Sequence, residues 1–185
     1  LALLSDSLAL LHRHYLDAFP HDCLLFHAPD DAAFTSEVRK QILAPFAHRN
    51  HTISFREVPQ QYWRIPEDIA PATANTNRSE WLGWPRFSLG YRHMIRWYTI
   101  GLWEYLERRG YDWVMRMDED SRLLSPIPYN IFERMQGRDW TFGYRMVSYE
   151  SGFDGERFHS FVRNYLLNHG PSRPKWLLES CGRVG

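Results

Sequence analysis

Residues 111–120 read Tyr-Asp-Trp-Val-Met-Arg-Met-Asp-Glu-Asp, a run of large apolar side chains that ends in three acids. The odd positions from 111 to 117 are aromatic or Met, and they alternate with Asp, Val and Arg. This alternation is typical of a half-buried β-strand. Helical patterns on both sides favour a strand within an α/β sheet. The run therefore predicts a central strand that leads directly into a cluster of acids.

The three acids after this predicted strand are Asp118, Glu119 and Asp120. Residues two apart on an extended backbone point the same way, so Asp118 and Asp120 share one side and Glu119 faces the other. Ligands of α/β sheets bind beyond the carboxyl ends of the strands. Paired carboxylates there suit Mg²⁺ or Mn²⁺, which in turn holds a diphosphate. For an isolated Asp-x-Asp, a solvated acidic turn is the alternative interpretation.

Composition sets the broad class of the chain. The 185 residues suit one globular domain with a sizeable core. The 22 basic and 22 acidic residues cancel, so charge gives no reason to expect nucleic acid or an anionic membrane as a partner. No apolar run approaches the roughly 20 residues of a membrane span. Cys23 and Cys181 are two buried thiols or one disulfide, and the missing initiator Met predicts a piece of a longer protein.

Helical and strand patterns alternate along the chain. We expect helices over 5–15, 34–46, 85–109, 129–136 and 158–170, and strands over 23–27, 52–58, 113–117 and 140–147. A long connection, 59–84, is rich in Trp and Tyr and is predicted to approach the ligand site. Asp30 and Asp31 also follow a strand, but they precede a helix, where capping is the favoured role. The alternating order predicts a three-layer α/β domain.

Several short motifs occur in one order along the chain. Residues 91–96 form Tyr-x-x-Met-x-Arg, residues 113–116 form Trp-x-x-Arg before the acids, and residues 142–144 read Phe-Gly-Tyr. Residues 63–66, Trp-Arg-Ile-Pro, precede them. In this order the motifs resemble family 15 glycosyltransferases, the fungal α-1,2-mannosyltransferases of the Golgi. The resemblance extends from Leu24 to Tyr149.

The resemblance implies a fold and an activity. The fold is GT-A-like, a partial three-layer α/β/α sandwich, with residues 1–185 as one truncated domain. The implied reaction moves mannose from GDP-mannose to a glycan or glycoprotein acceptor, with retention of configuration and with Mn²⁺ (or Mg²⁺) as the metal. The implied location is the lumen of the Golgi or another secretory compartment. Membrane attachment would come only through an anchor that this chain does not contain.

The resemblance and the residue pattern together give candidate site residues. The family's Glu-Pro-Asp aligns with Asp118–Asp120, which becomes a plain Asp-x-Asp. We assign metal binding to Asp118 and Asp120, with Asp120 as the direct ligand. Tyr91 matches a family tyrosine near the reaction centre, although its helical spacing also suits a core residue. The candidate cofactor-binding residues are Arg116, Arg96 and Glu119.

Each cofactor-binding candidate has a structural alternative. Arg116 shares a strand face with Asp118, so it either neutralises phosphate or pairs with an acid. Arg96 lies three residues after His93 on one helical face, where both contact substrate or belong to a polar network. Glu119 faces either the donor or a neighbouring helix.

Three functions remain open from the sequence. Two parts of the family have no match between Leu1 and Gly185. One is a later segment that holds the candidate nucleophilic Glu, together with a His downstream of it. The other is the family's first strand. The chain is therefore a metal-dependent mannosyltransferase, or a non-catalytic remnant that binds a nucleotide sugar or carbohydrate. A metal-dependent phosphoesterase is the third possibility, with His27, Asp30 and Asp31 as extra ligands.

Overall fold

A computed structural model describes residues 2–29, 31–49, 52–67, 88–146 and 155–169, without the side chains of 155–159. The chain divides into two compact units, Leu1–Asp139 and Trp140–Gly185, which are described separately. The single domain expected from the sequence stays a prediction. No helix in the described ranges is both long and apolar enough to cross a bilayer.

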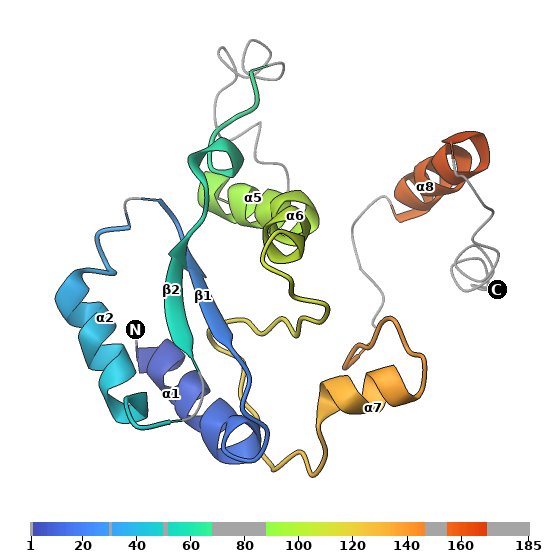
Figure 1. Ribbon diagram of the computed structural model, residues 1–185. Helices are drawn as coiled ribbons and strands as arrows, with labels where there is room; N and C mark the ends of the chain where they lie inside the picture. The colour runs from blue at the N-terminus through green and yellow to red at the C-terminus, as the bar shows by residue number, and fades with distance from the viewer. Residues whose placement is uncertain (1, 30, 50–51, 68–87, 147–154, 170–185) are drawn as a thin grey trace. The chain divides into compact units, whose positions relative to one another are not determined.

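A parallel βαβ unit forms the first half of the larger unit (Figure 1). Strands β1 (Cys23–His27) and β2 (Ile53–Glu57) pair in parallel, with Cys23 opposite Ile53 and His27 opposite Glu57. Helix α2 (Ser36–Leu43) and a 3₁₀ turn (Ala44–Phe46) connect them. These elements confirm the predicted strands over 23–27 and 52–58 and the predicted helix over 34–46.

The start of α2 corrects one sequence-based expectation. The helix is capped by Thr35, whose Oγ1 accepts a hydrogen bond from the Val38 amide at 3.3 Å. Asp31 instead accepts from the Ala33 amide at 2.9 Å and closes a local turn. The capping role proposed for Asp31 is therefore wrong, because the helix begins too far along the chain. Asp30 lies outside the described residues.

Three consecutive segments form the long helix of the unit. They are α5 (Leu89–Arg96), a π-helical segment (Trp97–Gly101) and α6 (Leu102–Glu107). The Ser88 hydroxyl caps the helix at the Tyr91 amide, at 3.1 Å. Gly110, with φ at +73°, follows its end. The predicted helix is confirmed from residue 88 onward, and the π segment was not predicted.

Two helical layers enclose β1. On one face, Leu24 and Phe26 pack against a buried cluster of Val58, Trp97, Leu102 and Leu106. On the other face, Cys23 packs against a cluster from α1 (Ala2–Leu11) and its π-helical extension (His12–Leu16). Successive residues of β1 thus contact opposite layers, as strand geometry requires. The predicted helix over 5–15 is confirmed, and so is the three-layer order around this strand.

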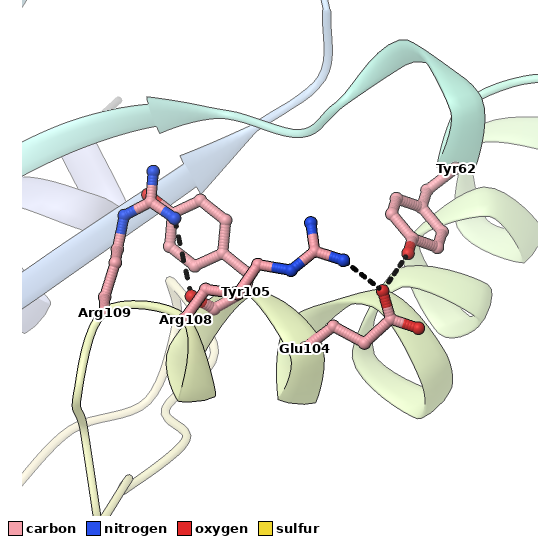
Figure 2. A network of polar contacts seen from close by, with 5 residues as sticks. All are labelled: Tyr62, Glu104, Tyr105, Arg108 and Arg109. Atoms are coloured by element: carbon pink, nitrogen blue, oxygen red, sulfur yellow. Dashed lines mark hydrogen bonds and ion pairs between the residues drawn. The ribbon is translucent and has the colours of Figure 1, made fainter.

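A polar network ties the loop after β2 to α6 (Figure 2). The Glu104 carboxylate accepts hydrogen bonds from the Tyr62 hydroxyl at 3.2 Å and from Arg108 at 3.4 Å. The Arg109 guanidinium lies 3.6 Å above the Tyr105 ring and donates to the Tyr105 carbonyl at 3.4 Å. These contacts are exposed, so each stabilises the fold weakly. Of these contacts, the Tyr62–Glu104 hydrogen bond holds the 3₁₀ turn Gln60–Tyr62 against the long helix, and the others lie within the helix and its end.

Residues 111–118 are extended but do not join the sheet. Their exposure alternates as predicted, with odd positions half-buried and even positions exposed. Met115 and Met117 pack against the cluster of Leu11, Tyr15 and Leu16. Within the described ranges, however, no strand pairs with this segment. The predicted strand over 113–117 is thus an extended segment held by side-chain packing rather than by a ladder of backbone hydrogen bonds.

The remaining helices agree with the sequence, and the last predicted strand does not. Helix α7 (Ile131–Gly137) is capped by Asn130, whose Oδ1 accepts from the Phe132 amide at 3.1 Å. In the second unit, α8 (Gly155–His169) matches the predicted helix. Residues 140–146 form no strand. Their alternation predicts two chemically different faces, but a strand also needs a hydrogen-bonding neighbour, and none is found among the described residues.

Candidate functional site

The three predicted acids lie in a tight turn, residues 118–121, here called the acid turn. The Ser121 amide donates to the Asp118 carbonyl at 2.9 Å and closes it. From α1, the buried Ser7 hydroxyl donates to the Ser121 carbonyl at 2.6 Å. Asp118, Glu119 and Asp120 are all exposed. The hydrogen bond from Ser7 thus fixes the backbone of the turn, while its three carboxylates remain accessible to solvent.

Arg116 pairs with the first acid of the turn. Its Nη2 and Nε lie 3.0 and 3.2 Å from the same oxygen, Oδ1 of Asp118. Among the described residues, Oδ2 of Asp118 has neither a hydrogen-bond nor an ion-pair partner. The two side chains lie on one side of the extended segment, as their spacing predicted. The ion pair was one of the two roles expected for Arg116.

Tyr98 completes this group from the π segment of the long helix. Its ring centroid lies 4.1 Å from Cζ of Arg116, a cation–π contact. Burial raises the pKa of Tyr98, Arg116 lowers it, and Asp118 and Glu119 raise it. Sequence reasoning missed Tyr98 as a site residue. The available signal was its position seven residues after Tyr91, which places both on one helical face.

A cavity of about 1000 Å³ opens beside these residues. Its lining is mostly apolar and comes from α1, β1, the long helix and the extended segment 111–118. Four of the predicted site residues also line it, namely Tyr91, Arg116, Asp118 and Glu119. Asp120 and Arg96 are not part of this lining. The expectation that Asp118 and Asp120 share one side assumed an extended backbone, but residues 118–121 form a turn, and Glu119 rather than Asp120 lines the cavity with Asp118. The cavity therefore joins the acid turn to the Tyr91 face of the long helix.

Arg96 occupies a different position from the other candidates. Its Nη1 donates to the carbonyls of Gln61 and Arg64, both at 3.2 Å, in a separate small pocket. His93, one turn earlier, is buried against Trp63 with ring centroids 5.6 Å apart. Burial, followed by the nearby Arg96 charge, lowers the pKa of His93. In this structure Arg96 holds the loop after β2, and its proposed cofactor role stays a prediction.

His27 and Asp31, the extra ligands that a phosphoesterase would need, line the same cavity. Both ring nitrogens of His27 have partners: Nδ1 lies 2.8 Å from the Ala28 carbonyl and Nε2 lies 3.1 Å from Nη2 of Arg39. A histidine engaged on both sides has no free nitrogen for a metal. This arrangement does not favour the phosphoesterase.

The acid turn fits one mode of metal binding. No three His, Cys, Asp or Glu side chains in the described ranges converge as a ready-made metal site. Mg²⁺-like ions, however, are often held by one or two carboxylates together with water and substrate phosphates. Exposed carboxylates suit that mode, and so does Oδ2 of Asp118, for which the described part of the chain supplies no partner. The turn can thus supply one or two oxygen ligands, and a bound diphosphate the others.

Comparisons with known proteins agree on one family. Residues 2–169 match the family model described as glycolipid 2-alpha-mannosyltransferase. The glycolipid 2-alpha-mannosyltransferase of Saccharomyces cerevisiae is 26% identical over 125 residues, which is 65% of this chain and 27% of that protein. The alpha-1,2 mannosyltransferase KTR1 of the same yeast is 25% identical over 154 residues, 80% of this chain and 37% of that protein. The chain thus spans between a quarter and two fifths of the length of these relatives.

A solved structure supports the fold. The crystal structure of core-mannan synthase A (CmsA/Ktr4) from Aspergillus fumigatus, in its Mn/GDP form, superposes with a TM-score of 0.74. Sequence identity is 19%, and the match covers 91% of this chain and 44% of the other. The expected partial GT-A-like α/β fold is confirmed by this match.

Proposed function

The chain belongs to the glycolipid 2-alpha-mannosyltransferase family of glycosyltransferases, and on this premise we propose that it forms part of a metal-dependent α-1,2-mannosyltransferase. The proposed donor is GDP-mannose and the acceptor a glycan or glycoprotein. The observation that carries the proposal is the accessible acid turn beside a large cavity, within a chain that matches the family over residues 2–169. The secretory pathway, with the site in the lumen, is the proposed location.

The proposed roles follow from the chemistry of diphosphate departure. Asp118 and Asp120 would hold Mn²⁺, with Asp120 as the direct ligand, and the metal would stabilise negative charge on the leaving nucleoside diphosphate. Arg116 and Glu119 would contact the donor from the same cavity. Tyr91 would face the reacting sugar from the long helix. Support for Mn²⁺ and a guanine nucleotide comes from the Mn/GDP form of the fungal structure.

A transfer assay tests the proposal. The protein is incubated with GDP-mannose, Mn²⁺ and methyl α-mannoside, and disaccharide is measured by mass spectrometry. We expect product that EDTA abolishes, and a loss on the order of 100-fold in kcat/KM for Asp118→Asn and for Asp120→Asn. Glu107→Gln changes an exposed acid on α6 and serves as the matched control, with unchanged activity expected.

Each failure of this assay has a distinct meaning. Full activity of Asp120→Asn would refute the metal assignment. A clear preference for a UDP-sugar would refute GDP-mannose as the donor. Binding of GDP-mannose with neither transfer nor hydrolysis would support the non-catalytic remnant instead.

A further inference from the structure

The contact between Arg116 and Asp118 has the features of an exchangeable pair. The Arg116 side chain is 44% exposed and that of Asp118 is 58% exposed. Nε and Nη2 of Arg116 both contact the same carboxylate oxygen, Oδ1. The bidentate pairing with two oxygens, which strengthens Arg–carboxylate contacts, is therefore not formed. Exposed pairs of this kind contribute little to stability because water screens them. The pair can therefore open without disturbing the fold.

Tyr98 holds Arg116 in a way that does not depend on Asp118. The ring lies 4.1 Å from Cζ of Arg116, and the half-buried Tyr98 is set in the long helix. A guanidinium that stacks on a ring keeps its N–H donors free at the edge of its plane. Arg116 can thus turn its donors from one acceptor to another while its face stays on Tyr98.

Two positive groups would compete for Asp118 under the proposed function. Under that function Asp118 helps Asp120 to hold the cation, and the cation and the Arg116 guanidinium cannot both be fully neutralised by the Asp118 carboxylate. Once the cation is bound, the guanidinium needs another acceptor. A phosphate group matches its planar fork of donors better than any neutral group does.

We propose that Arg116 exchanges partners when the site is loaded: it neutralises Asp118 in the empty site and moves to the nucleotide diphosphate in the loaded one, with Tyr98 as its fixed platform. This inference rests on the proposed function. It makes Arg116 a diphosphate-binding residue that couples diphosphate binding to metal binding, and Tyr98 the residue that positions it. It also gives the extended segment a role in offsetting one of the three negative charges of the acid turn when no donor is present.

The exchange predicts opposite effects of one substitution on two affinities. In Arg116→Met, Mn²⁺ alone should bind about two- to fivefold more tightly, because the competing cation is gone. GDP in saturating Mn²⁺ should bind about 10- to 100-fold more weakly, because charge-assisted hydrogen bonds to phosphate are lost. Mn²⁺ affinity is measured by electron paramagnetic resonance and GDP affinity by calorimetry. Arg116→Lys should recover the metal affinity of the wild type and only part of its GDP affinity.

Substitutions of the platform separate stacking from charge. Tyr98→Phe keeps the ring and should bind GDP like the wild type. Tyr98→Leu should weaken GDP binding severalfold and leave binding of Mn²⁺ alone within twofold of the wild type. Arg109→Met is the matched control, since Arg109 stacks on Tyr105 at 3.6 Å outside the cavity lining. Both affinities should be unchanged in this variant.

The outcomes distinguish the exchange from the proposed function. If Arg116→Met weakens both affinities, or changes neither, Arg116 is not an exchanging partner and the inference is overturned. If the wild-type protein binds neither Mn²⁺ nor GDP with Mn²⁺, the proposed function fails and the inference with it. Thermal unfolding of each variant, followed by circular dichroism, shows that a changed affinity does not reflect loss of the fold.

Discussion

Ser7 illustrates at the scale of one residue how the acid turn is held in place. Its buried hydroxyl donates to the carbonyl of Ser121, 114 positions away, at 2.6 Å. The same backbone turn is closed by the Ser121 amide and the Asp118 carbonyl. A buried acceptor that loses its donor costs more free energy than an exposed one. The position of the acids therefore depends on a side chain in the first helix.

Ser7→Ala should lower the free energy of unfolding by about 1–2 kcal/mol, because the Ser121 carbonyl loses its buried partner. Ser5→Ala is the control, since Ser5 is exposed on the same helix, and it should be neutral or slightly stabilising. Urea unfolding followed by fluorescence measures both values. Equal stability of the two variants would show that the Ser7 hydrogen bond does not support the turn.

Cys23 gives a prediction on pH. Cys23 has no disulfide partner within the part of the chain that the structure describes, which leaves out Cys181, and burial raises the pKa of its thiol from 9.0 to about 11. Folding thus favours the protonated thiol, so this contribution to stability is complete below pH 9 and is lost as pH rises towards 11. Alkylation of Cys23 by iodoacetamide, followed by mass spectrometry of its peptide, should show a midpoint near pH 11.

A control completes the test of Cys23. The difference in unfolding free energy between the wild type and Cys23→Ala should shrink over the same pH interval. An alkylation midpoint at or below pH 9 in the folded protein would contradict the effect of burial.

At the scale of single elements, periodicity predicted helices more reliably than sheet strands. The long helix shows apolar residues at steps of three and four, and its hydrogen bonds lie within the segment itself, so pattern alone was sufficient. For residues 111–118 the alternation correctly predicted which side chains are half-buried. It could not predict a ladder, because a strand's hydrogen bonds depend on a neighbour elsewhere in the chain. The failed strand at 140–146 has the same cause.

Gly101 gives a prediction at this scale. In a helix, Gly→Ala is normally stabilising by up to about 1 kcal/mol. Here the added Cβ would lie 2.6 Å from the Trp97 ring and 2.7 Å from the Tyr62 ring. Trp97 is only 1% exposed, and the rings of Phe26 and Tyr105 pack against it with centroids 5.2 and 5.7 Å away, which opposes a shift. Gly101→Ala should therefore lower the free energy of unfolding by about 1–3 kcal/mol.

Gly137→Ala is the matched control for this substitution. Gly137 ends α7, and a Cβ there would meet nothing within 4 Å. We expect no loss of stability, and a gain of up to about 0.5–1 kcal/mol. Chemical denaturation of both variants gives the comparison. A stabilised Gly101→Ala would mean that the approach of the two rings does not constrain this position.

At the scale of the whole molecule, the sequence predicted the class of fold, and the roles of the site residues stay predictions. The resemblance to the family was sufficient for the α/β fold, whereas metal binding by the acids is not yet tested. Tyr98 was missed because its ring reads as one more apolar residue of a helical face, and its contact with Arg116 depends on tertiary packing. The separation of Arg96 from the cavity was missed for a similar reason, because its two acceptors are backbone carbonyls of a loop. Such contacts leave no periodic signal in a sequence.

The central claim is that the acid turn binds a divalent cation, which in turn coordinates the diphosphate of GDP. Calorimetric titration with GDP tests this claim most directly. The wild-type protein and the Asp120→Ala variant are each titrated in Mn²⁺ and again in EDTA. The account predicts binding that requires Mn²⁺ and that falls by about 10- to 100-fold in Asp120→Ala. GDP binding of equal strength in EDTA, or in Asp120→Ala with Mn²⁺, would contradict it.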